Sequence, residues 1–335
     1  MYKIAIDVMG GDHAPQAILE GARLALESFQ DIELDLFGDQ TIIEKELGHH
    51  ERVHISPTSQ LVEGEDEPVK AIRSKKDSSM VRAARSVKDG DNQALVSAGN
   101  TGALLAAGLL IIGRVKNIDR PGLMPIIPTV NSDHPYLLLM DAGANATCKA
   151  INLHQFAILA SYYAKSVLGI DHPRVGLINN GTEAGKGTDL TKEVYKLLSQ
   201  EESIEFVGNI EAKELLNGVV DVAVTDGFTG NAILKTLEGA GKSLGHFLKA
   251  TLSQGSLKTK LGALMVKGAL KESMGQLDDS QHGGAVLLGI KNPLIKAHGS
   301  SNALAFFNAI RQARNLLEVD AIGHIRQYFE SDRKN

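Results

Sequence analysis

The chain has 335 residues, 43% of them hydrophobic, and a formal charge of −5, so it can bury one large core or two moderate ones. The single cysteine, Cys148, excludes an internal disulfide, the negative charge argues against nucleic-acid binding, and no apolar run approaches the roughly 20 residues of a membrane span. With 34 glycines, no tryptophan and no signal-like N-terminus, we expect a soluble, cytoplasmic α/β enzyme.

The first predicted strand, residues 2–8, ends in a turn that contains two glycines. Gly10 and Gly11 let the backbone approach a ligand closely, and the carboxyl end of a strand faces the ligand cleft in open α/β sheets. Asp7 lies at that end, and His13 is the one side chain of the turn that titrates near neutral pH. We therefore expect Asp7, Gly10 and Gly11 to contact substrate. His13 is a candidate catalytic group, although a lone histidine is more often structural.

A second strand, turn and helix begin at residue 94, after strands over residues 32–37 and 53–56 and a basic helix over residues 69–88. The basic helix presents either a solvated face or a docking face for an acidic partner. Helix N-termini combine free N–H groups with a partial positive charge, so the turn before the next helix is expected to bind an anion. Its candidate ligands are Ser97, Asn100, Thr101 and Gly102.

Two apolar runs, residues 123–127 and 136–140, are typical of central strands that are covered on both faces. Pro125 and Pro128 oppose this interpretation of the first run, because proline cannot donate a hydrogen bond to a central ladder. The second run ends in a third polar turn, residues 141–145, with Asn145 as a candidate ligand of the substrate.

The turn over residues 179–187, Asn-Asn-Gly-Thr-Glu-Ala-Gly-Lys-Gly, is expected to be the centre of the functional site, around which the rest of the chain is arranged. It follows an apolar strand and precedes a predicted helix, so its N–H groups can hold an anion, and Lys186 adds a full positive charge. Asn180, Gly181 and Glu183 are further candidate ligands. A lone Gly-Lys-Gly is usually an exposed loop, but the repeated design indicates that several turns converge on one cleft.

A fourth turn, residues 225–231, follows an apolar strand over residues 219–224 and supplies Asp226, Gly227 and Asn231 as candidate ligands. Residues 239–243, Gly-Ala-Gly-Lys-Ser, do not form a nucleotide P-loop, because they lie within a helical pattern and no strand precedes them. Gly-x-Gly-x-x-Gly does not follow any strand either. Dinucleotide binding of the usual kind therefore lacks support in the sequence.

Residues 256–272 are predicted to form a basic amphipathic helix, although Lys258 interrupts its apolar arc. Such a helix can lie on an anionic membrane, bind an acidic partner or pack in a dimer interface, and the sequence leaves these alternatives open. The residues expected to make these contacts are Leu257, Lys260, Leu261, Leu264, Met265, Lys267 and Lys271.

Strands over residues 285–290 and 294–297 and helices over residues 303–317 and 321–329 complete the chain. His282 and His298 lie in polar turns beside these two strands and are also candidate ligands. Because the sequence contains no linker, repeat or low-complexity segment, we expect one compact α/β unit over residues 1–335, either undivided or with two lobes around a cleft.

Six motifs resemble those of the phosphate acyltransferases of bacterial phospholipid synthesis. The most specific is the opening segment Ile-Ala-Ile-Asp-Val-Met-Gly-Gly-Asp-His-Ala-Pro, residues 4–15. The others begin at Ser97, Asp141, Asn180, Thr225 and His298, and the match runs in order from one end of the chain to the other.

The resemblance implies transfer of a long acyl chain from acyl carrier protein to inorganic phosphate, by a homodimer without metal or nucleotide. It also implies a Rossmann-like, three-layer α/β/α sandwich similar to the isocitrate and isopropylmalate dehydrogenases and to phosphotransacetylases. The acyl phosphate would feed a membrane glycerol-3-phosphate acyltransferase, so peripheral association with the inner face of the cell membrane is expected. Two alternatives stay open: a phosphotransacetylase-like enzyme that uses acyl-CoA, and a non-catalytic membrane scaffold for lipid synthesis.

The motifs and the resemblance together predict a separate role for each turn. Lys186 and the N–H groups of residues 100–102 and 181–187 would bind phosphate, and Asn231 would orient phosphate or the thioester carbonyl. His13 is a candidate for protonating the departing pantetheine thiolate, a leaving group whose thiol pKa is about 8.5.

Overall fold

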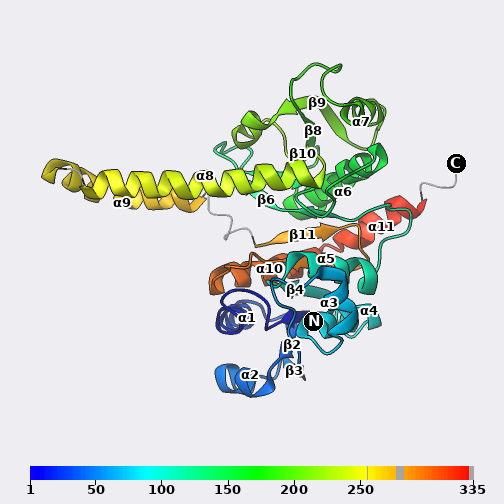
Figure 1. Ribbon diagram of the computed structural model, residues 1–335, viewed down its shortest axis with the longest axis vertical. Coiled ribbons are helices and arrows are strands. Elements are labelled where there is room, and N and C mark those ends of the chain that lie inside the picture. Colours follow the sequence, from blue (N-terminus) through cyan, green and yellow to red (C-terminus); the bar gives the residue numbers. More distant parts are fainter. Residues whose placement is uncertain (255, 277–282, 332–335) are drawn as a thin grey trace.

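The computed structural model describes residues 1–254, 256–276 and 283–331 (Figure 1). Its strands are β1 Tyr2–Asp7, β2 Ile32–Gly38, β3 Val53–Pro57, β4 Ala94–Ser97, β5 Gly122–Met124, β6 Ile126–Pro128, β7 Tyr136–Met140, β8 Arg174–Asn179, β9 Glu205–Glu211, β10 Val222–Val224, β11 Ala285–Leu288 and β12 Leu294–Lys296. Its helices are α1 Gln16–Ser28, α2 Gln40–Leu47, α3 Pro68–Ser74, α4 Ser79–Asp89, α5 Thr101–Ala107, η1 Gly108–Ile112, α6 Ala150–Leu168, α7 Asp189–Ser199, η2 Ala212–Asn217, α8 Gly227–Gln254, α9 Leu257–Gln276, α10 Ala303–Glu318 and α11 Ala321–Ser331.

The first sheet, in the order β3-β2-β1-β4-β12-β11-β5, is buried between two helical layers. β1 is parallel to β2 and β4, and β12 is parallel to β4, so the carboxyl ends of these strands lie along one edge. Alternate residues of β1 enter different cores. Ile4 and Ile6 belong to the core that contains residues of α1 and α10, whereas Ala5 belongs to the core that contains Met80 and Val81 of α4.

The second sheet, in the order β6-β7-β10-β8-β9, also has helices on both faces. Phe156 of α6 packs in the core on one face, while Leu215 of η2 and the first turns of α8 cover the other through Ile233, Leu234 and Leu237. β7, β10, β8 and β9 are parallel, so the turns that leave them start from one edge. The predicted α/β fold, with helical layers around parallel strands, is confirmed.

The run predicted as one central strand over residues 123–127 is two edge strands. β5 pairs antiparallel with β11 at the end of the first sheet, and β6 pairs antiparallel with β7 at the end of the second. Pro125 separates them and has no N–H for a ladder, while its carbonyl accepts a hydrogen bond from Leu139 N at 3.3 Å. The prediction of a central strand is wrong here, because the chain passes from one sheet to the other at this proline.

The basic segment predicted as one helix over residues 69–88 is divided into α3 and α4. Between them, Lys75 Nζ lies 2.5 Å from the Asp66 carboxylate, and Ser78 caps α4 by accepting from a backbone N–H of its first turn at 3.4 Å. Side chains that bond locally in this way compete with continuation of a helix. The prediction of a single helix is therefore wrong at residues 75–78.

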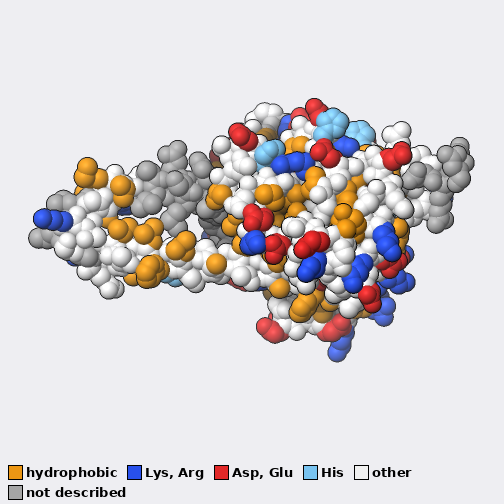
Figure 2. All heavy atoms as spheres, turned by 90° about the horizontal axis from the view of Figure 1, so that it is seen from above, with side chains coloured by type: hydrophobic (Ala, Val, Ile, Leu, Met, Phe, Trp, Pro, Cys, Tyr) orange, Lys and Arg blue, Asp and Glu red, His pale blue; other side chains and the backbone are white. Residues whose placement is uncertain are grey.

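α8 and α9 form a helical hairpin that projects beyond both sheets (Figure 1). We call residues 239–254 of α8 together with α9 the arm; residues 239–243 lie inside α8, in agreement with the rejection of a P-loop. Apolar side chains are exposed along it (Figure 2), among them Leu244, Phe247, Leu264 and Met265, at 67%, 70%, 69% and 87%. Among the residues that the structure describes, no helix combines the length and apolarity needed to cross a membrane.

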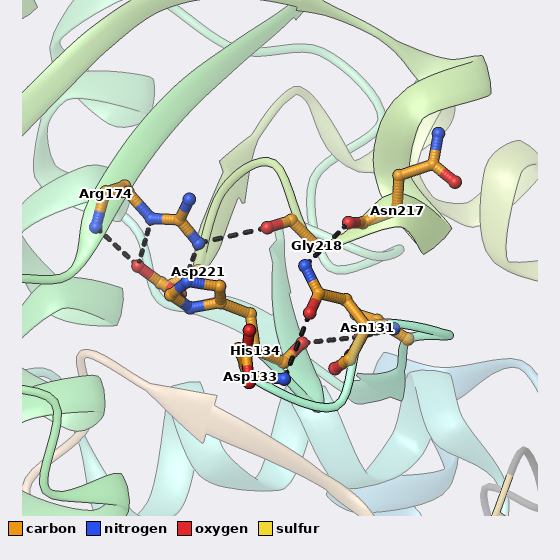
Figure 3. Close-up of polar contacts among 8 residues, drawn as sticks. Asn131, Asp133, His134, Arg174, Asn217, Gly218 and Asp221 are labelled. Atoms are coloured by element: carbon orange, nitrogen blue, oxygen red, sulfur yellow. Dashed lines mark hydrogen bonds and ion pairs between the residues drawn. The ribbon is translucent and has the colours of Figure 1, made fainter.

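A buried carboxylate joins the amino ends of β8 and β10 (Figure 3). Asp221, only 2% exposed, accepts hydrogen bonds from Arg174 N at 2.8 Å and from Arg174 Nε and Nη2 at 3.0 Å. His134 Nδ1 lies 3.1 Å from the same carboxylate, and Arg174 also donates to the Gly218 carbonyl. This network fixes the edge of the sheet that lies opposite the polar turns.

Candidate active site at the carboxyl edges of the two sheets

The turns that leave β1, β4 and β12 pack tightly against one another. A Cβ atom on Gly10 would lie 2.7 Å from Gly99 N, and one on Gly11, whose φ is +112°, would lie 2.9 Å from the Ala98 side chain. Asp12 N donates to the Gly299 carbonyl at 2.8 Å. Side chains larger than hydrogen do not fit where these backbones meet, so the two predicted glycines are required for the contact.

Asp7 lies beneath these turns and anchors them. It is 1% exposed and accepts hydrogen bonds from Ser79 Oγ and Ser97 Oγ, both at 2.6 Å. Burial raises the pKa of Asp7, against the opposing effect of these two hydroxyl groups. Asp7 and Ser97 are both predicted as substrate ligands. The structure buries both side chains beneath the turns, where they bond to each other.

The β4–α5 turn uses its asparagine side chain within the protein. Asn100 Oδ1 caps α5 by accepting from Ala103 N at 2.9 Å, and its Nδ2 donates to carbonyl groups of residues 63, 64 and 66. Gly102 packs on the ring of Pro68, and Thr101 is exposed at the start of the helix. The backbone of this turn, rather than the Asn100 amide group, is left to face a ligand.

In the second sheet, the turn after β7 supports the start of α8. The Asp141 carboxylate accepts from Leu123 N, Ala144 N and the backbone and amide group of Asn145, and burial raises its pKa. Because Asn145 Nδ2 also donates to the Pro121 carbonyl at 2.8 Å, this predicted ligand is buried and satisfied.

The first turn of α8 lies directly on this support. A Cβ atom on Gly227 would lie 2.6 Å from the Asn145 carbonyl, so helix and turn are in contact. The Asp226 carboxylate caps the helix by accepting from Thr229 N at 2.9 Å and Thr229 Oγ1 at 3.0 Å. Asn231 is exposed and lies over Gly143, which leaves its amide group available to a ligand.

Lys186 is exposed in the turn that leaves β8, next to β10 in the sheet. Its described contacts stay within that turn: the side chain lies over Gly181, and its carbonyl accepts from Asn179 Nδ2 at 3.1 Å. Asn209 Nδ2 holds the turn by donating to the Glu183 carbonyl at 2.8 Å. Asn180 is exposed, like Lys186, so the role of this turn in phosphate binding stays a prediction.

α8 begins at the carboxyl edge of the second sheet and, about three turns further on, contacts the turn after β12 of the first sheet. Glu238 of α8 lies 3.9 Å from His298 Nε2 in the turn after β12 and 2.8 Å from Lys235 Nζ. His298 Nδ1 in turn lies 2.8 Å from Ser300 Oγ. His13 is exposed in the neighbouring β1–α1 turn, whereas His282 lies outside the described residues.

Lys296, the last residue of β12, is a site residue that the sequence patterns do not single out. It is 8% exposed, and its Nζ donates to the carbonyl groups of Ala98, at 3.2 Å, and Ala297. Burial lowers the pKa of Lys296 to about 8. The feature of the sequence that could have identified Lys296 is its position as the last residue of an apolar strand, two residues before His298.

Within the described parts of the chain, no three His, Cys, Asp or Glu side chains are grouped so that they could hold a metal ion. Burial raises the pKa of Cys148 to about 11, and its Sγ donates to the Asn145 carbonyl at 3.7 Å. A partly buried thiol with a raised pKa stays protonated at neutral pH and is therefore a poor nucleophile.

Solved structures of phosphotransacylating enzymes share the fold of this chain. The chain superposes on a phosphotransacetylase from Streptococcus pyogenes with a TM-score of 0.61 at 15% identity, covering 96% of this chain and 94% of that one. A branched-chain phosphotransacylase from Enterococcus faecalis gives 0.56 at 17% identity, with 95% and 100% covered. At these identities the likeness shows a shared fold alone.

The sequence comparisons define the family. A family model described as "Fatty acid synthesis protein" matches residues 2–323. The phosphate acyltransferase of Streptococcus equi subsp. zooepidemicus (strain H70) is 55% identical over 332 residues, covering 99% of this chain and 98% of the relative. That of Streptococcus pneumoniae (strain Hungary19A-6) is 53% identical, covering 99% and 100%. The chain belongs to this family of phosphate acyltransferases, and the resemblance noted in the sequence is confirmed.

Proposed function

We propose that this enzyme transfers a long-chain acyl group from the thioester of acyl carrier protein to inorganic phosphate. A phosphate oxygen attacks the carbonyl carbon, the C–S bond breaks, and the products are acyl phosphate and the carrier's thiol. The observation that supports this most directly is the contact of the β12 turn, which packs on the β1 and β4 turns, with α8, through His298 and Glu238 about three helical turns after Gly227, in a chain of this family.

The proposed chemistry needs no nucleophilic side chain from the protein. Phosphate is already an oxyanion, so the protein needs to position it and to stabilise the negative charge of the tetrahedral state. Lys186 and backbone N–H groups of the turns bind the phosphate, and the free amide group of Asn231 orients it or the thioester carbonyl. His13, exposed beside the same turns, protonates the thiolate. No side chain becomes acylated in this mechanism.

The docking of an acidic carrier protein is supported by cations beside the β4–α5 turn. Lys70 and Arg73 are exposed on α3, and Arg85 of α4 is partly exposed. Pro68, the first residue of α3, packs on Gly102 of that turn. A carrier held on α3 would therefore place its pantetheine arm near the candidate site, and complementary charge would speed its arrival.

The donor assay tests the proposed function and separates it from that of a phosphotransacetylase using acyl-CoA. The same long acyl chain is offered on carrier protein and on CoA, with and without phosphate, and released thiol and hydroxylamine-trapped acyl phosphate are measured. We expect phosphate-dependent turnover with kcat/KM at least about 10-fold higher for the carrier thioester, or about 1.4 kcal/mol of discrimination. Equal or better use of CoA would favour the phosphotransacetylase, and consumption of thioester without phosphate would contradict both.

We also propose that the arm attaches the enzyme to an anionic membrane surface and to a second copy of the chain. Its exposed Leu264 and Met265 are accompanied by exposed Lys260 and Lys267, a combination that suits the boundary between lipid headgroups and acyl chains. On α8, Phe247 supplies apolar surface that a second arm can cover. Membrane contact would bring the amphiphilic product close to a membrane glycerol-3-phosphate acyltransferase on the inner face of the cell membrane.

Leu257, Leu261 and Lys271, also predicted for this contact, lie on α9 at positions whose side chains the structure does not describe. Leu264, Met265 and Val266 are successive and all exposed, so apolar side chains face more than one direction around α9. This departs from the single apolar arc predicted for residues 256–272.

The double change Leu264→Glu and Met265→Glu is expected to abolish cosedimentation with phosphatidylglycerol vesicles. A buried side chain of this size contributes about 1.5–3 kcal/mol, and the new carboxylates are repelled by the lipid. The matched control is Ser253→Glu with Gln254→Glu, two exposed polar positions of the same arm. Unchanged vesicle binding by the Leu264/Met265 variant would count against the membrane role, and sedimentation equilibrium reports separately on the dimer.

A further inference from the structure

Three neighbouring parallel strands of the first sheet end in a row of polar residues. Asp7 of β1 is in register with Ser97 of β4, and Ser97 is in register with Lys296 of β12. The residues two positions earlier, Ala5 and Leu95, belong to the core beneath α4 and α5, so the row points to that face of the sheet. Its members are 1%, 0% and 8% exposed.

A buried ammonium group is costly unless it is compensated, and Lys296 is compensated by backbone. Its Nζ donates to the carbonyl groups of Ala98 and Ala297, the first residues after β4 and β12. Ala297 N also donates to the Ser97 carbonyl at 2.9 Å. The ammonium group therefore ties together the entries of two turns that belong to the candidate site.

The charged groups around Lys296 come from both sheets. Asp7 of β1 and Asp12 of the β1–α1 turn favour its protonated form, while Lys235 of α8 disfavours it. Burial is the larger effect and lowers the pKa of Lys296 to about 8. His298 follows two residues later, and Glu238 lies between His298 and Lys235.

We propose that Lys296 is a positioning residue for acyl transfer: its ammonium group fixes the β4–α5 and β12–α10 turns against each other, so that their N–H groups and His298 face the phosphate as one rigid surface. The proposal rests on the placement of the active site at this edge. A neutral amine binds carbonyl groups less strongly than an ammonium group does, because the charge assistance is lost. Catalysis should therefore decline as pH rises through the alkaline range in which Lys296 loses its proton.

The test compares the wild type with Lys296→Arg and Lys296→Met between pH 6.5 and 9.5, with Lys291→Met as a control in the exposed turn between β11 and β12. For the wild type we expect kcat/KM for phosphate to fall on the alkaline side. Lys296→Arg keeps a cation at every pH, so its residual activity should lack that fall. Lys296→Met should lose about 100-fold at pH 7, the effect of a misplacement on the order of 1 Å. The Lys291 control should follow the wild type.

A second measurement follows the turn itself and does not depend on turnover. Amide hydrogen exchange of residues 97–103, corrected for the intrinsic rate, should become faster at alkaline pH in the wild type and not in Lys296→Arg. An alkaline fall in activity and exchange that is the same in Lys296→Arg as in the wild type would overturn the proposal, even if Lys296→Met fails to fold. Absence of phosphate-dependent turnover in the wild type would refute the proposed function instead, and hydrogen exchange would still decide the role of Lys296.

Discussion

Replacing Lys186 with alanine is expected to lower kcat/KM for phosphate by about 100- to 1000-fold, the usual effect of removing one group that stabilises charge in a transition state. The side chain is exposed, and its described contacts lie within its own turn, so the folded protein should persist. Lys196→Ala, at an exposed position in the last turn of α7, is the matched control. Phosphate-dependent thiol release is measured together with the thermal unfolding curve.

Near-normal turnover by the Lys186 variant would mean that another cation binds the phosphate. Lys235, paired with Glu238 at the contact between the sheets, would then be the next group to replace. A rise in KM for phosphate with kcat unchanged would instead show that Lys186 binds phosphate equally well in the ground state and in the transition state.

Replacing Asp221 with asparagine should produce the largest change in stability, lowering the free energy of unfolding by about 3 kcal/mol at pH 7. The carboxylate is buried, and its loss leaves the Arg174 guanidinium without its charged partner (Figure 3). Asp171→Asn, an exposed position in the loop before β8, is the control and should change stability by less than about 0.5 kcal/mol. Urea unfolding measures both, and the donor assay should remain close to wild type because the network lies at the far edge of the sheet.

The contribution of Asp221 should depend on pH. Burial acts to raise the pKa of this carboxyl, but hydrogen bonds and charge from Arg174 outweigh burial and hold the pKa below its usual range. The stabilisation is therefore fully present above the unfolded-state pKa of about 3.9 and is lost as pH falls towards the lower, folded-state pKa. The difference between wild type and Asp221→Asn should shrink below pH of about 4, and a constant difference down to pH 3 would rule out the ion pair as its cause.

Local patterns in the sequence predict many of the strand–turn–helix units of the fold. An apolar run followed by a glycine-rich turn and an amphipathic segment identifies a strand, turn and helix, because each depends on neighbours along the chain. These patterns predict the β8–α7 unit around residues 179–187, and Thr188 caps α7 directly after this turn. The division at Pro125 was signalled by the proline, but its consequence, two strands in different sheets, was not.

The use of each polar side chain was decided by the tertiary structure. Asn100 and Asn145 look alike as candidate ligands in the sequence, yet both are satisfied by groups far away along the chain, at residues 63–66 and at Pro121. Lys296 is the last residue of an apolar strand with no distinctive motif. Only the register of the strands, which aligns Lys296 with Ser97 and Ser97 with Asp7, shows that it lies beneath the candidate site. By itself, the sequence determined the family and the order of the turns. Which turns meet, and which of their side chains remain free for a ligand, follows from burial and hydrogen bonding between distant segments, which no local pattern contains.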